Sequence, residues 1–473
     1  MLRIHLIAIG GSAMHSLAIE MLRLGHNVSG SDDLIFDPAK KNLEKAGILP
    51  KKMGWYEEKI NEEIDIVILG MHAREDNPEL LRAKELGLVI KSYPEFLADY
   101  SVDKSRVVIA GSHGKTTITS LIIHALNYNE IEIDFMVGAQ LKSYNNTLKL
   151  SEENNFIIFE GDEYLSSPID LQPKFLWYKP EIALISGIAW DHINVFPTFE
   201  NYTKQFDLFI SSIKPGGVLI FNNEDKILKQ IVEANTNPIK KIPYKSPNYK
   251  IKNNITYLET EEGDLPLSIF GHHNLLNVEA ARWISQLMGL DVSSFYEALP
   301  TFKGASNRLE LIIRGKTSYL YKDFAHAPSK VIATVQAVKN QFKDFKITVC
   351  LELHTYSSLD ANFLKEYANT LDNADDAIIF YDPEALKIKN RIPVDPKFIK
   401  EAFANKNIEV LNSRTSLNLN LFKREFKNKI LLMMSSGNFG DLNWKNLKNH
   451  INTNLNIKIN FQSHNKILRL IIN

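Results

Sequence analysis

The sequence predicts an α/β protein built on parallel sheets and divided into about three domains. Short apolar runs alternate with helix-like patterns along most of the chain, and this alternation is typical of parallel sheets. The length of 473 residues is enough for roughly three domains. We expect domains at residues 1–103, 104–303 and 304–450, followed by a tail at residues 451–473 that shows no clear period.

The composition limits which binding partners and which cellular compartment we expect for this protein. The chain has 55 basic and 56 acidic residues, so no overall charge favours a nucleic acid or an anionic membrane. Its single cysteine, Cys350, excludes an intramolecular disulfide and fits a reducing compartment. There is no signal-peptide pattern, and no apolar run reaches the ~20 residues of a membrane span. We expect a soluble cytoplasmic protein without nucleic-acid or membrane partners, and the sequence leaves its oligomeric state open.

Residues 1–103 predict a first parallel α/β unit. The runs LRIHLIAIG and EIDIVILG predict strands, and SLAIEMLRLG and NPELLRAKELG predict helices. Glycine or polar residues follow the strand ends, where open parallel sheets bind ligands. The candidates for binding a nucleotide-like ligand are Gly10, Gly11, Ser31, Asp32 and His72. The turn IGGSAMHSLA lacks the third glycine of a dinucleotide fingerprint, so a tight turn that serves only packing is an equal alternative.

The stretch AGSHGKTT, residues 110–117, lies between an apolar strand pattern and an apolar-periodic helix pattern. The usual phosphate-loop expression needs a glycine where this chain has Ile109. The chemistry needs only a buried strand, a turn with free N–H groups, a lysine for the phosphates and a hydroxyl for Mg²⁺. The stretch supplies all of these, which favours a phosphate loop (P-loop) over an ordinary turn. Its candidate residues are Gly111, Ser112, His113, Gly114, Lys115, Thr116 and Thr117.

Two further polar clusters follow apolar strands of the same unit. Glu160, Asp162 and Glu163 come at the end of NNFIIF, and Asp191 and His192 come after EIALISGI. Carboxylates at a strand end suit Mg²⁺, which binds one or two protein oxygens beside nucleotide phosphates. A solvated acidic loop and a structural histidine are the alternatives. The convergence of three polar clusters on one predicted sheet favours a ligand site.

Polar groups near the third unit could complete such a site. The run GHHNLLNVEAA opens a helix pattern and puts Asn274 and Asn277 on one helix face. Its adjacent histidines do not predict zinc, because neighbouring side chains diverge and no cysteine or second histidine pair completes a tetrahedral set. Arg308, Asp323 and His326 lie around the first strands of the third unit. Together they are groups that a neighbouring domain could bring over a nucleotide.

The order of these motifs resembles the Mur ligase family, ATP-dependent amide-forming enzymes of bacterial cell-wall biogenesis. Six motifs occur in the family's order within about residues 1–445, namely GSHGKTT, EGDEY, the DH of AWDHINVFP, GHHNLLN, the arginine of SNRLE and the aspartate of KDFAHAP. The resemblance implies a Rossmann-like UDP-sugar-binding domain, a central ATP-binding P-loop domain and a Rossmann-like C-terminal domain for the amine substrate.

The resemblance also implies roles for the candidate residues. ATP and Mg²⁺ are the expected cofactors, and UDP-N-acetylmuramate and a peptide or amino-acid amine are the expected partners. Lys115, Glu163 and His192 would be catalytic, and Thr116 would join Glu163 and His192 at the metal. Many family members carry a carbamylated lysine after the DH segment, and Lys204 lies nearby in this chain. Residues implied to grip ATP are Asn274, Arg308 and Asp323.

Within the family, EGDEYLSSPIDLQPKFLWYKP and MMSSGNFGDL are similar to segments of the ligases of peptidoglycan recycling. They imply a ligase that joins UDP-N-acetylmuramate to L-alanyl-γ-D-glutamyl-meso-diaminopimelate through an acyl phosphate. An alanine pocket needs a partner for a free carboxylate, and LELHTYSSL contains no arginine for it. Its Glu352 and His354 could instead bind a longer peptide. An L-alanine-adding ligase, and a binding protein that ATP switches without amide formation, are the alternatives.

Overall fold

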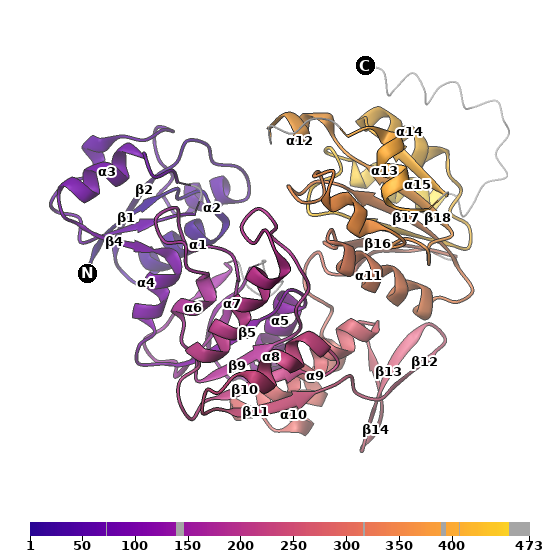
Figure 1. Cartoon of the computed structure of the whole chain (residues 1–473), viewed down its shortest axis with the longest axis horizontal. Helices are drawn as coiled ribbons and strands as arrows, with labels where there is room; N and C mark the ends of the chain where they lie inside the picture. Colours follow the sequence, from indigo (N-terminus) through magenta and orange to yellow (C-terminus); the bar gives the residue numbers. More distant parts are fainter. Residues whose placement is uncertain (72, 139–145, 316, 389–393, 406, 454–473) are drawn as a thin grey trace. The chain divides into compact units, whose positions relative to one another are not determined.

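The computed structural model describes residues 1–453 apart from positions 72, 139–145, 316, 389–393 and 406. The chain divides into two compact units, Met1–Ser306 and Asn307–Asn473. Each unit alternates strands and helices, which confirms the predicted α/β class (Figure 1). Within the described residues, no helix is long and apolar enough to cross a membrane. His72 and residues 454–473 of the expected tail lie outside the described residues.

The first sheet is parallel and has the strand order β2-β1-β3-β4. Its strands are β1 (Arg3–Ile7), β2 (Asn27–Ser31), β3 (Ile66–Leu69) and β4 (Val89–Ser92). Its helices are α1 (Ser12–Arg23), α2 (Ala39–Lys45), α3 (Pro78–Glu85) and α4 (Tyr93–Tyr100). The start of α4 is set by a capping box in which Ser92 and Glu95 each bind the other's backbone N–H. The predicted turn at Gly10 and Gly11 lies between β1 and α1, at the carboxyl edge of this sheet.

The central sheet has seven strands in the order β11-β10-β9-β5-β8-β6-β7, all parallel except β7. The strands are β5 (Ser105–Ala110), β6 (Asp134–Met136), β7 (Leu148–Lys149), β8 (Phe156–Glu160), β9 (Ile182–Ile185), β10 (Val218–Asn222) and β11 (Lys240–Tyr244). The helices are α5 (Lys115–Tyr128), α6 (Lys174–Trp177), α7 (Phe199–Ser212) and α8 (Lys226–Ala234). β5 is flanked by β8 and β9, so the three strands that carry the predicted polar clusters are neighbours.

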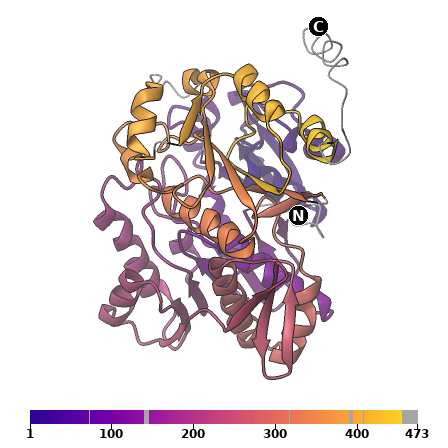
Figure 2. The ribbon, with the colours of Figure 1, turned by 90° about the vertical axis from the view of Figure 1, so that its right-hand side faces the viewer.

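A small antiparallel sheet and two helices complete the first unit. The sheet comprises β12 (Tyr249–Lys252), β13 (Ile255–Thr260) and β14 (Gly263–Leu267), and it can be followed as a separate three-stranded ribbon in Figure 2. Helices α9 (His272–Leu287) and α10 (Val292–Ala298) follow it. Apolar side chains of α9 share one buried cluster with those of α5, including Leu275, Val278 and Leu121. This packing places the start of α9 beside the loop that precedes α5.

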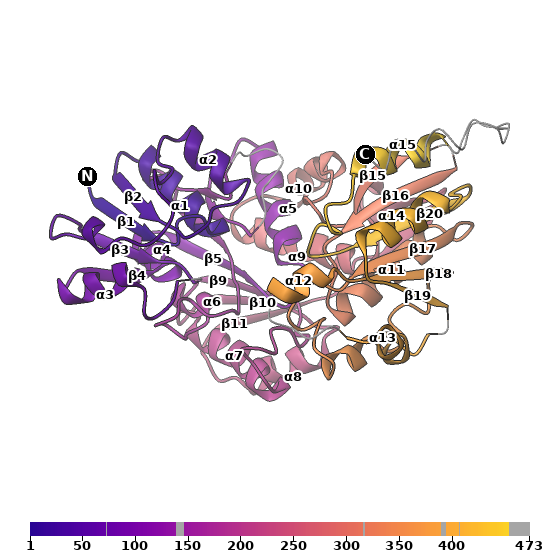
Figure 3. The same ribbon diagram turned by 90° about the horizontal axis from the view of Figure 1, so that it is seen from above.

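The second unit holds a six-stranded sheet in the order β15-β16-β20-β17-β18-β19, parallel except for β15 (Figure 3). Its strands are β15 (Glu310–Arg314), β16 (Ser318–Asp323), β17 (Lys346–Glu352), β18 (Asp376–Phe380), β19 (Ile408–Leu411) and β20 (Lys429–Met434). Its helices are α11 (Pro328–Gln341), α12 (Pro383–Ile388), α13 (Pro396–Ala402), α14 (Arg414–Lys423) and α15 (Trp444–Thr453). Residues 451–453, where the tail was expected to begin, are the last turn of α15.

One buried arginine joins the first sheet to the central sheet. Arg106 of β5 is buried and donates to the carbonyl oxygens of Ala98, Ser101 and Tyr178 at 2.7, 3.0 and 3.0 Å. These carbonyls belong to the end of α4, the residue after it and the residue after α6. The two sheets also share one apolar cluster, which runs from Leu6 and Phe96 to Phe159. The sheets are separate, but the core beneath them is continuous.

Replacing Arg106 should therefore destabilise the first unit. Arg106→Met would remove the guanidinium donor from three buried carbonyl groups, and it would leave Tyr178 O without the bond at 3.0 Å. We expect a loss of about 3 kcal/mol in the free energy of unfolding. Urea denaturation followed by tryptophan fluorescence measures this loss. Arg74→Met is the matched control, because the Arg74 side chain is 82% exposed and should change the value by less than about 0.5 kcal/mol. Equal effects of the two substitutions would contradict the role of Arg106.

Candidate active site

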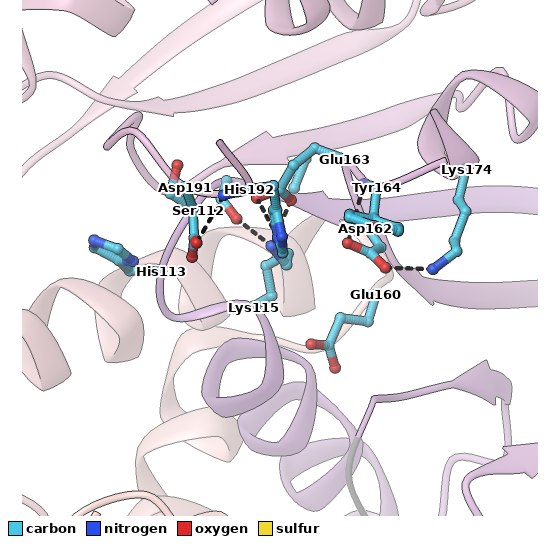
Figure 4. Close-up of polar contacts among 12 residues, drawn as sticks. Ser112, His113, Lys115, Glu160, Asp162, Glu163, Tyr164, Lys174, Asp191 and His192 are labelled. Atoms are coloured by element: carbon cyan, nitrogen blue, oxygen red, sulfur yellow. Dashed lines mark hydrogen bonds and ion pairs between the residues drawn. The ribbon is translucent and has the colours of Figure 1, made fainter. Parts of the chain in front are cut away.

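Three loops of the first unit meet at one edge of the central sheet. β5, β8 and β9 are neighbouring parallel strands, so the segments that follow them start at the same edge. These segments are residues 111–114, 161–163 and 186–192. Lys115, Glu163 and His192 point toward one another there (Figure 4). The structure thus brings together the three polar clusters that the sequence predicts.

Gly111 and Gly114 determine the path of the loop between β5 and α5. Their φ angles of +120° and +79° lie in a region that favours glycine. A Cβ atom on Gly111 would lie 2.2 Å from Ser186 Oγ, and one on Gly114 would lie 2.3 Å from Asn277 Oδ1. Helix α5 begins at Lys115 with no side-chain cap. No cap residue therefore occupies its first N–H groups, as is usual where a helix start binds phosphate.

Lys115 and Glu163 form a buried ion pair at the centre of this edge. Lys115 Nζ lies 2.7 Å from Glu163 Oε2 and donates to Gly111 O at 2.6 Å. The two side chains are only 14% and 1% exposed. Burial acts to lower the pKa of Lys115, but the charges of Glu163 and Asp162 outweigh burial and raise it. Lys115 therefore stays a cation, held above the loop that would cradle a phosphate.

Tyr202 is a site residue that no sequence motif indicates. It lies on α7, is fully buried, and its hydroxyl group is 2.7 Å from both Glu163 Oε1 and Ser112 Oγ. Burial, and then the charge of Glu163, raise the pKa of Tyr202 well above its ordinary value, so the hydroxyl stays protonated. A tyrosine on the apolar face of a helix has the pattern of a core residue. The nearby Lys204, considered for carbamylation, is exposed.

His192 is presented to the same carboxylate by an unusual backbone. Its φ angle is +56°, a left-handed conformation that is uncommon outside glycine and is often found at functional sites. Its Nε2 lies 3.8 Å from Glu163 Oε1. Its ring meets the edge of Tyr164 with the ring centres 5.0 Å apart. His192 thus approaches Glu163 from the segment after β9 (Figure 4).

Two of the three residues expected at a metal, Thr116 and Glu163, contact different partners. Thr116 Oγ1 donates to Glu160 Oε1 at 2.7 Å, whereas Glu163 pairs with Lys115. Glu160, one of the three strand-end carboxylates that the sequence suggests for Mg²⁺, contacts the hydroxyl of Thr116 directly. Its second oxygen accepts from Gly138 N at 2.7 Å. Its position at the end of β8, two residues before Asp162, is the sequence feature that made it a candidate.

This donor set fits Mg²⁺ bound together with a nucleotide. A hydroxyl and carboxylates are the oxygen ligands that Mg²⁺ prefers, and the ion usually takes only one or two protein carboxylates with phosphates and water. In the part of the chain that the structure describes, no three His, Cys, Asp or Glu side chains form a preassembled metal cluster. Thr116, Glu160 and Glu163 are therefore suited to a metal that arrives with phosphates, and less suited to a metal held by protein alone.

The third acid of the predicted cluster serves the fold. Asp162 accepts from Lys174 Nζ at 2.6 Å and from Tyr164 N at 3.2 Å. Lys174 is the first residue of α6, so this pair anchors that helix beside β8. Figure 4 shows Asp162 turned toward Lys174, while Glu163 faces Lys115.

Helix α9 supplies amide groups to the same loop. Asn274 and Asn277 share one face of α9, as predicted, and Asn277 Nδ2 donates to Asn274 Oδ1 at 3.4 Å. Asn274 Nδ2 also donates to Phe270 O at 2.9 Å. Both asparagines are buried, and Asn277 lies against Gly114. The contact between Asn277 and the loop joins positions more than 160 residues apart in the sequence.

The predicted residues of the first sheet hold its glycine turn together. Asp32 Oδ2 accepts from Gly10 N at 2.7 Å, and burial raises the pKa of Asp32. Ser31 is fully buried, and its hydroxyl accepts from Lys59 Nζ at 2.8 Å. Gly11 precedes α1, which has no side-chain cap. Ser31 and Asp32 thus shape the turn from beneath, and the free helix start at Gly11 is the part that could face a ligand.

In the second unit, Arg308 lies shortly before β15, and Asp323 is the last residue of β16. Asp323 is buried and accepts from the N–H groups of Leu309 and Ala325. The guanidinium of Arg308 lies 4.5 Å from the centre of the Phe324 ring. Asp323 therefore holds the backbone directly after Arg308 and directly after Phe324.

Glu352 and His354 lie at the end of β17 in the second unit. Glu352 is buried, and its Oε2 accepts from the Ser435 hydroxyl and from Phe439 N, the latter at 2.8 Å. This carboxylate holds the loop after β20 in place, and a contact of Glu352 with a ligand stays a prediction. The His354 side chain is 32% exposed, with Nδ1 4.0 Å from Glu352 Oε1.

Comparison with known proteins identifies the family to which this arrangement is similar. Residues 3–104 match the model of the Mur ligase family catalytic domain, and residues 109–284 match the model of the Mur ligase middle domain. A UDP-N-acetylmuramate–L-alanine ligase of Carboxydothermus hydrogenoformans is 30% identical over 390 residues, which cover 80% of this chain and 82% of that protein. The corresponding enzyme of Streptococcus agalactiae is 31% identical over 78% of this chain and 81% of its own length.

Solved structures show the same fold. A UDP-N-acetylmuramate–alanine ligase from Thermotoga maritima superposes with a TM-score of 0.69 at 20% identity, covering 95% of this chain and 98% of its own. A murein peptide ligase from Psychrobacter arcticus superposes with a TM-score of 0.65 at 21% identity, covering 97% and 100%. At such identities these two structures support the fold alone.

The expectation of a tripeptide amine was wrong. The curated relatives at 30–31% identity are L-alanine ligases. The segment that suggested the tripeptide has structural roles instead: Phe175 stacks on Phe209 with ring centres 4.7 Å apart, and Tyr178 stacks on Phe159 at 4.0 Å. Asp170 of the same segment accepts from Trp177 Nε1 at 2.8 Å. These residues pack the core, so their pattern carries no information about the amine.

The buried ion pair can be tested through stability alone. Lys115→Met leaves the Glu163 carboxylate buried without its cation, and we expect a loss of about 3 kcal/mol in the free energy of unfolding. Adding Glu163→Gln removes that charge and should recover part of the loss. Urea denaturation of the single and double variants measures both effects. Lys149→Met, which breaks a surface pair with Glu132, should change stability little. A double variant no more stable than Lys115→Met would contradict this account.

Proposed function

The chain belongs to the Mur ligase family of ATP-dependent amide-forming enzymes, and from this premise we propose that it joins UDP-N-acetylmuramate to L-alanine. The observation that carries the proposal is the buried pairing of Lys115 with Glu163 above an uncapped helix start. That arrangement suits the binding of nucleotide phosphates. The choice of L-alanine rests on the relatives at 30–31% identity, which act on that amino acid.

In the proposed reaction, the lactyl carboxylate of the muramic sugar attacks the γ-phosphorus of ATP and ADP leaves. The amine of L-alanine, after losing a proton, then attacks the acyl carbon of the acyl phosphate and releases phosphate. Such transfers depend mainly on positioning and on neutralising negative charge. Lys115 supplies a fixed positive charge at the phosphates, and the N–H groups at the start of α5 bind their oxygens.

Carboxylate, hydroxyl and imidazole groups around Lys115 would complete the ATP site. Mg²⁺, when bound, would neutralise phosphate charge from a site made by Thr116, Glu163 and Glu160. His192 would lie beside the reacting carboxylate or a second metal. Residues of the first unit proposed to contact the rest of ATP are Asn274 and Asn277. That Arg308 and Asp323 bind ATP stays a prediction from the family resemblance.

We assign the site for the sugar nucleotide to the first sheet, and the site for the amine to the sheet of the second unit. We assign UDP-N-acetylmuramate to the turn at Gly10 and Gly11, where α1 begins without a cap. We assign the amino acid to the second unit near His354, a partly exposed side chain at the end of β17. Residues 351–359 contain no arginine, so the carboxylate of L-alanine must be bound by another group there.

A panel of amines tests the proposal. With ATP, Mg²⁺ and UDP-N-acetylmuramate, phosphate release should require an amine, and L-alanine should give the highest kcat/KM. Glycine lacks one methyl group and should be roughly 10–200-fold poorer, because a methyl group in an apolar pocket contributes about 1–3 kcal/mol. Lys115→Ala is the control and should lower kcat on the order of 100-fold or more.

Two results would contradict the proposal. A higher kcat/KM for a peptide amine than for L-alanine would reverse the choice of substrate. ATP binding without any amide product, with every amine supplied, would indicate a nucleotide-switched binding protein.

A further inference from the structure

A chain of hydrogen bonds runs from the segment after β9 to the Glu163 carboxylate. Ala189 N donates to Ser112 Oγ at 2.9 Å, and Ser112 Oγ lies 2.7 Å from the Tyr202 hydroxyl. The Tyr202 hydroxyl lies 2.7 Å from Glu163 Oε1. The four residues come from the segment after β9, the phosphate loop, α7 and the segment after β8.

The direction of this chain follows from the chemistry of its two ends. A carboxylate can only accept, so the Tyr202 hydroxyl must donate to Glu163. Because the Tyr202 hydroxyl donates its single proton to Glu163, it can only accept from the Ser112 hydroxyl. The Ser112 oxygen in turn accepts from Ala189 N. The donor and the acceptor of each hydrogen bond in the chain are therefore fixed. Such a directed chain, fully satisfied and buried, holds its members in fixed positions.

The ring of Tyr202 is itself held firmly. It meets Phe206 edge to face at 5.4 Å and Phe196 at 5.6 Å between ring centres. Phe206 and Phe209 lie on the same buried face of α7. Packing of the Tyr202 ring in the apolar core therefore fixes the position of the Tyr202 hydroxyl beside Glu163.

Tyr202 and Lys115 hold different oxygens of one carboxylate. Lys115 Nζ is on Oε2 and the Tyr202 hydroxyl is on Oε1, while His192 approaches Oε1 only to 3.8 Å. With one partner on each oxygen, the carboxylate cannot turn about its terminal bond. Each oxygen still keeps a second lone pair for a cation.

We propose that Tyr202 is a positioning residue that orients Glu163 for a nucleotide-bound divalent cation and couples that carboxylate to Ser112 of the phosphate loop. This inference rests on the proposed function, because it assigns Glu163 to the metal of an ATP site. Tyr202 touches neither nucleotide nor sugar in this role and acts only through Glu163 and Ser112.

Tyr202→Phe removes the hydroxyl and keeps the ring in the core. The first measurement is Mn²⁺ binding, followed by electron paramagnetic resonance, in the presence of an ATP analogue with a methylene bridge between the β- and γ-phosphorus atoms. We expect the affinity for Mn²⁺ to fall about tenfold to a hundredfold, the usual weight of a hydrogen bond to a charged group. The Mg²⁺ concentration needed for half-maximal turnover should rise in parallel, and KM for UDP-N-acetylmuramate should not change.

Tyr178→Phe is the matched control. Tyr178 is an equally buried tyrosine of the same core, stacked on Phe159, and its hydroxyl has no hydrogen-bond partner among the described residues. The same chemical change there should leave Mn²⁺ affinity unaltered. Ser112→Ala should reproduce part of the Tyr202→Phe effect, and the double variant should be little worse than Tyr202→Phe alone, because both changes break one chain.

The outcomes separate this inference from the proposed function. Unchanged or tighter Mn²⁺ binding in Tyr202→Phe, with unfolding like that of Tyr178→Phe, would overturn the positioning role even if L-alanine is the substrate. Weaker Mn²⁺ binding in Tyr202→Phe would support the role even if no amine in the panel is ligated. Strictly additive effects of Ser112→Ala and Tyr202→Phe would overturn the coupling between the two residues.

Discussion

The buried ion pair between Lys115 and Glu163 is the constraint on which the site depends. Two charges removed from water are tolerated only when each has close partners, and here the groups involved come from three segments. Lys115 is also bound by Gly111 O, and Glu163 by the Tyr202 hydroxyl. The loop after β5, the segment after β8 and α7 are therefore held in register by one requirement, the satisfaction of two buried charges.

The strand order of the central sheet brings further polar residues next to the Lys115–Glu163 pair. Because β5 lies between β8 and β9, polar residues far apart in the sequence, such as Lys115 and Glu163 at a separation of 48 residues, emerge at one edge. Close packing then sharpens the arrangement: Gly114 is in contact with Asn277, and Gly111 with Ser186, at distances that leave no room for a Cβ atom. The glycines thus serve the approach of α9 and of the segment after β9 as much as they serve the turn itself.

The wrong prediction of a tripeptide amine arose from a segment whose residues have structural roles in this chain. Residues 164–178 contain the aromatic side chains that pack α6 against α7, and Asp170 ties this segment to Ser92 beside α4 at 3.1 Å. These residues make packing and hydrogen-bond contacts within the fold. Glu352 is similar, because a buried carboxylate that binds Ser435 and Phe439 shapes a loop whatever substrate that loop meets.

The sequence by itself determined the alternation of strands and helices, the strand–loop–helix at residues 105–128 and the polar strand ends, because periodicity and glycine placement act over a few neighbouring residues. It also determined that Asn274 and Asn277 share a helix face. Only the tertiary structure decided that Thr116 pairs with Glu160, that Asp162 turns to Lys174, and that Tyr202 reaches Glu163. Those contacts depend on strand order and helix packing, which bring together residues distant in sequence, and a buried tyrosine or carboxylate has the same local pattern whether it serves the core or the site.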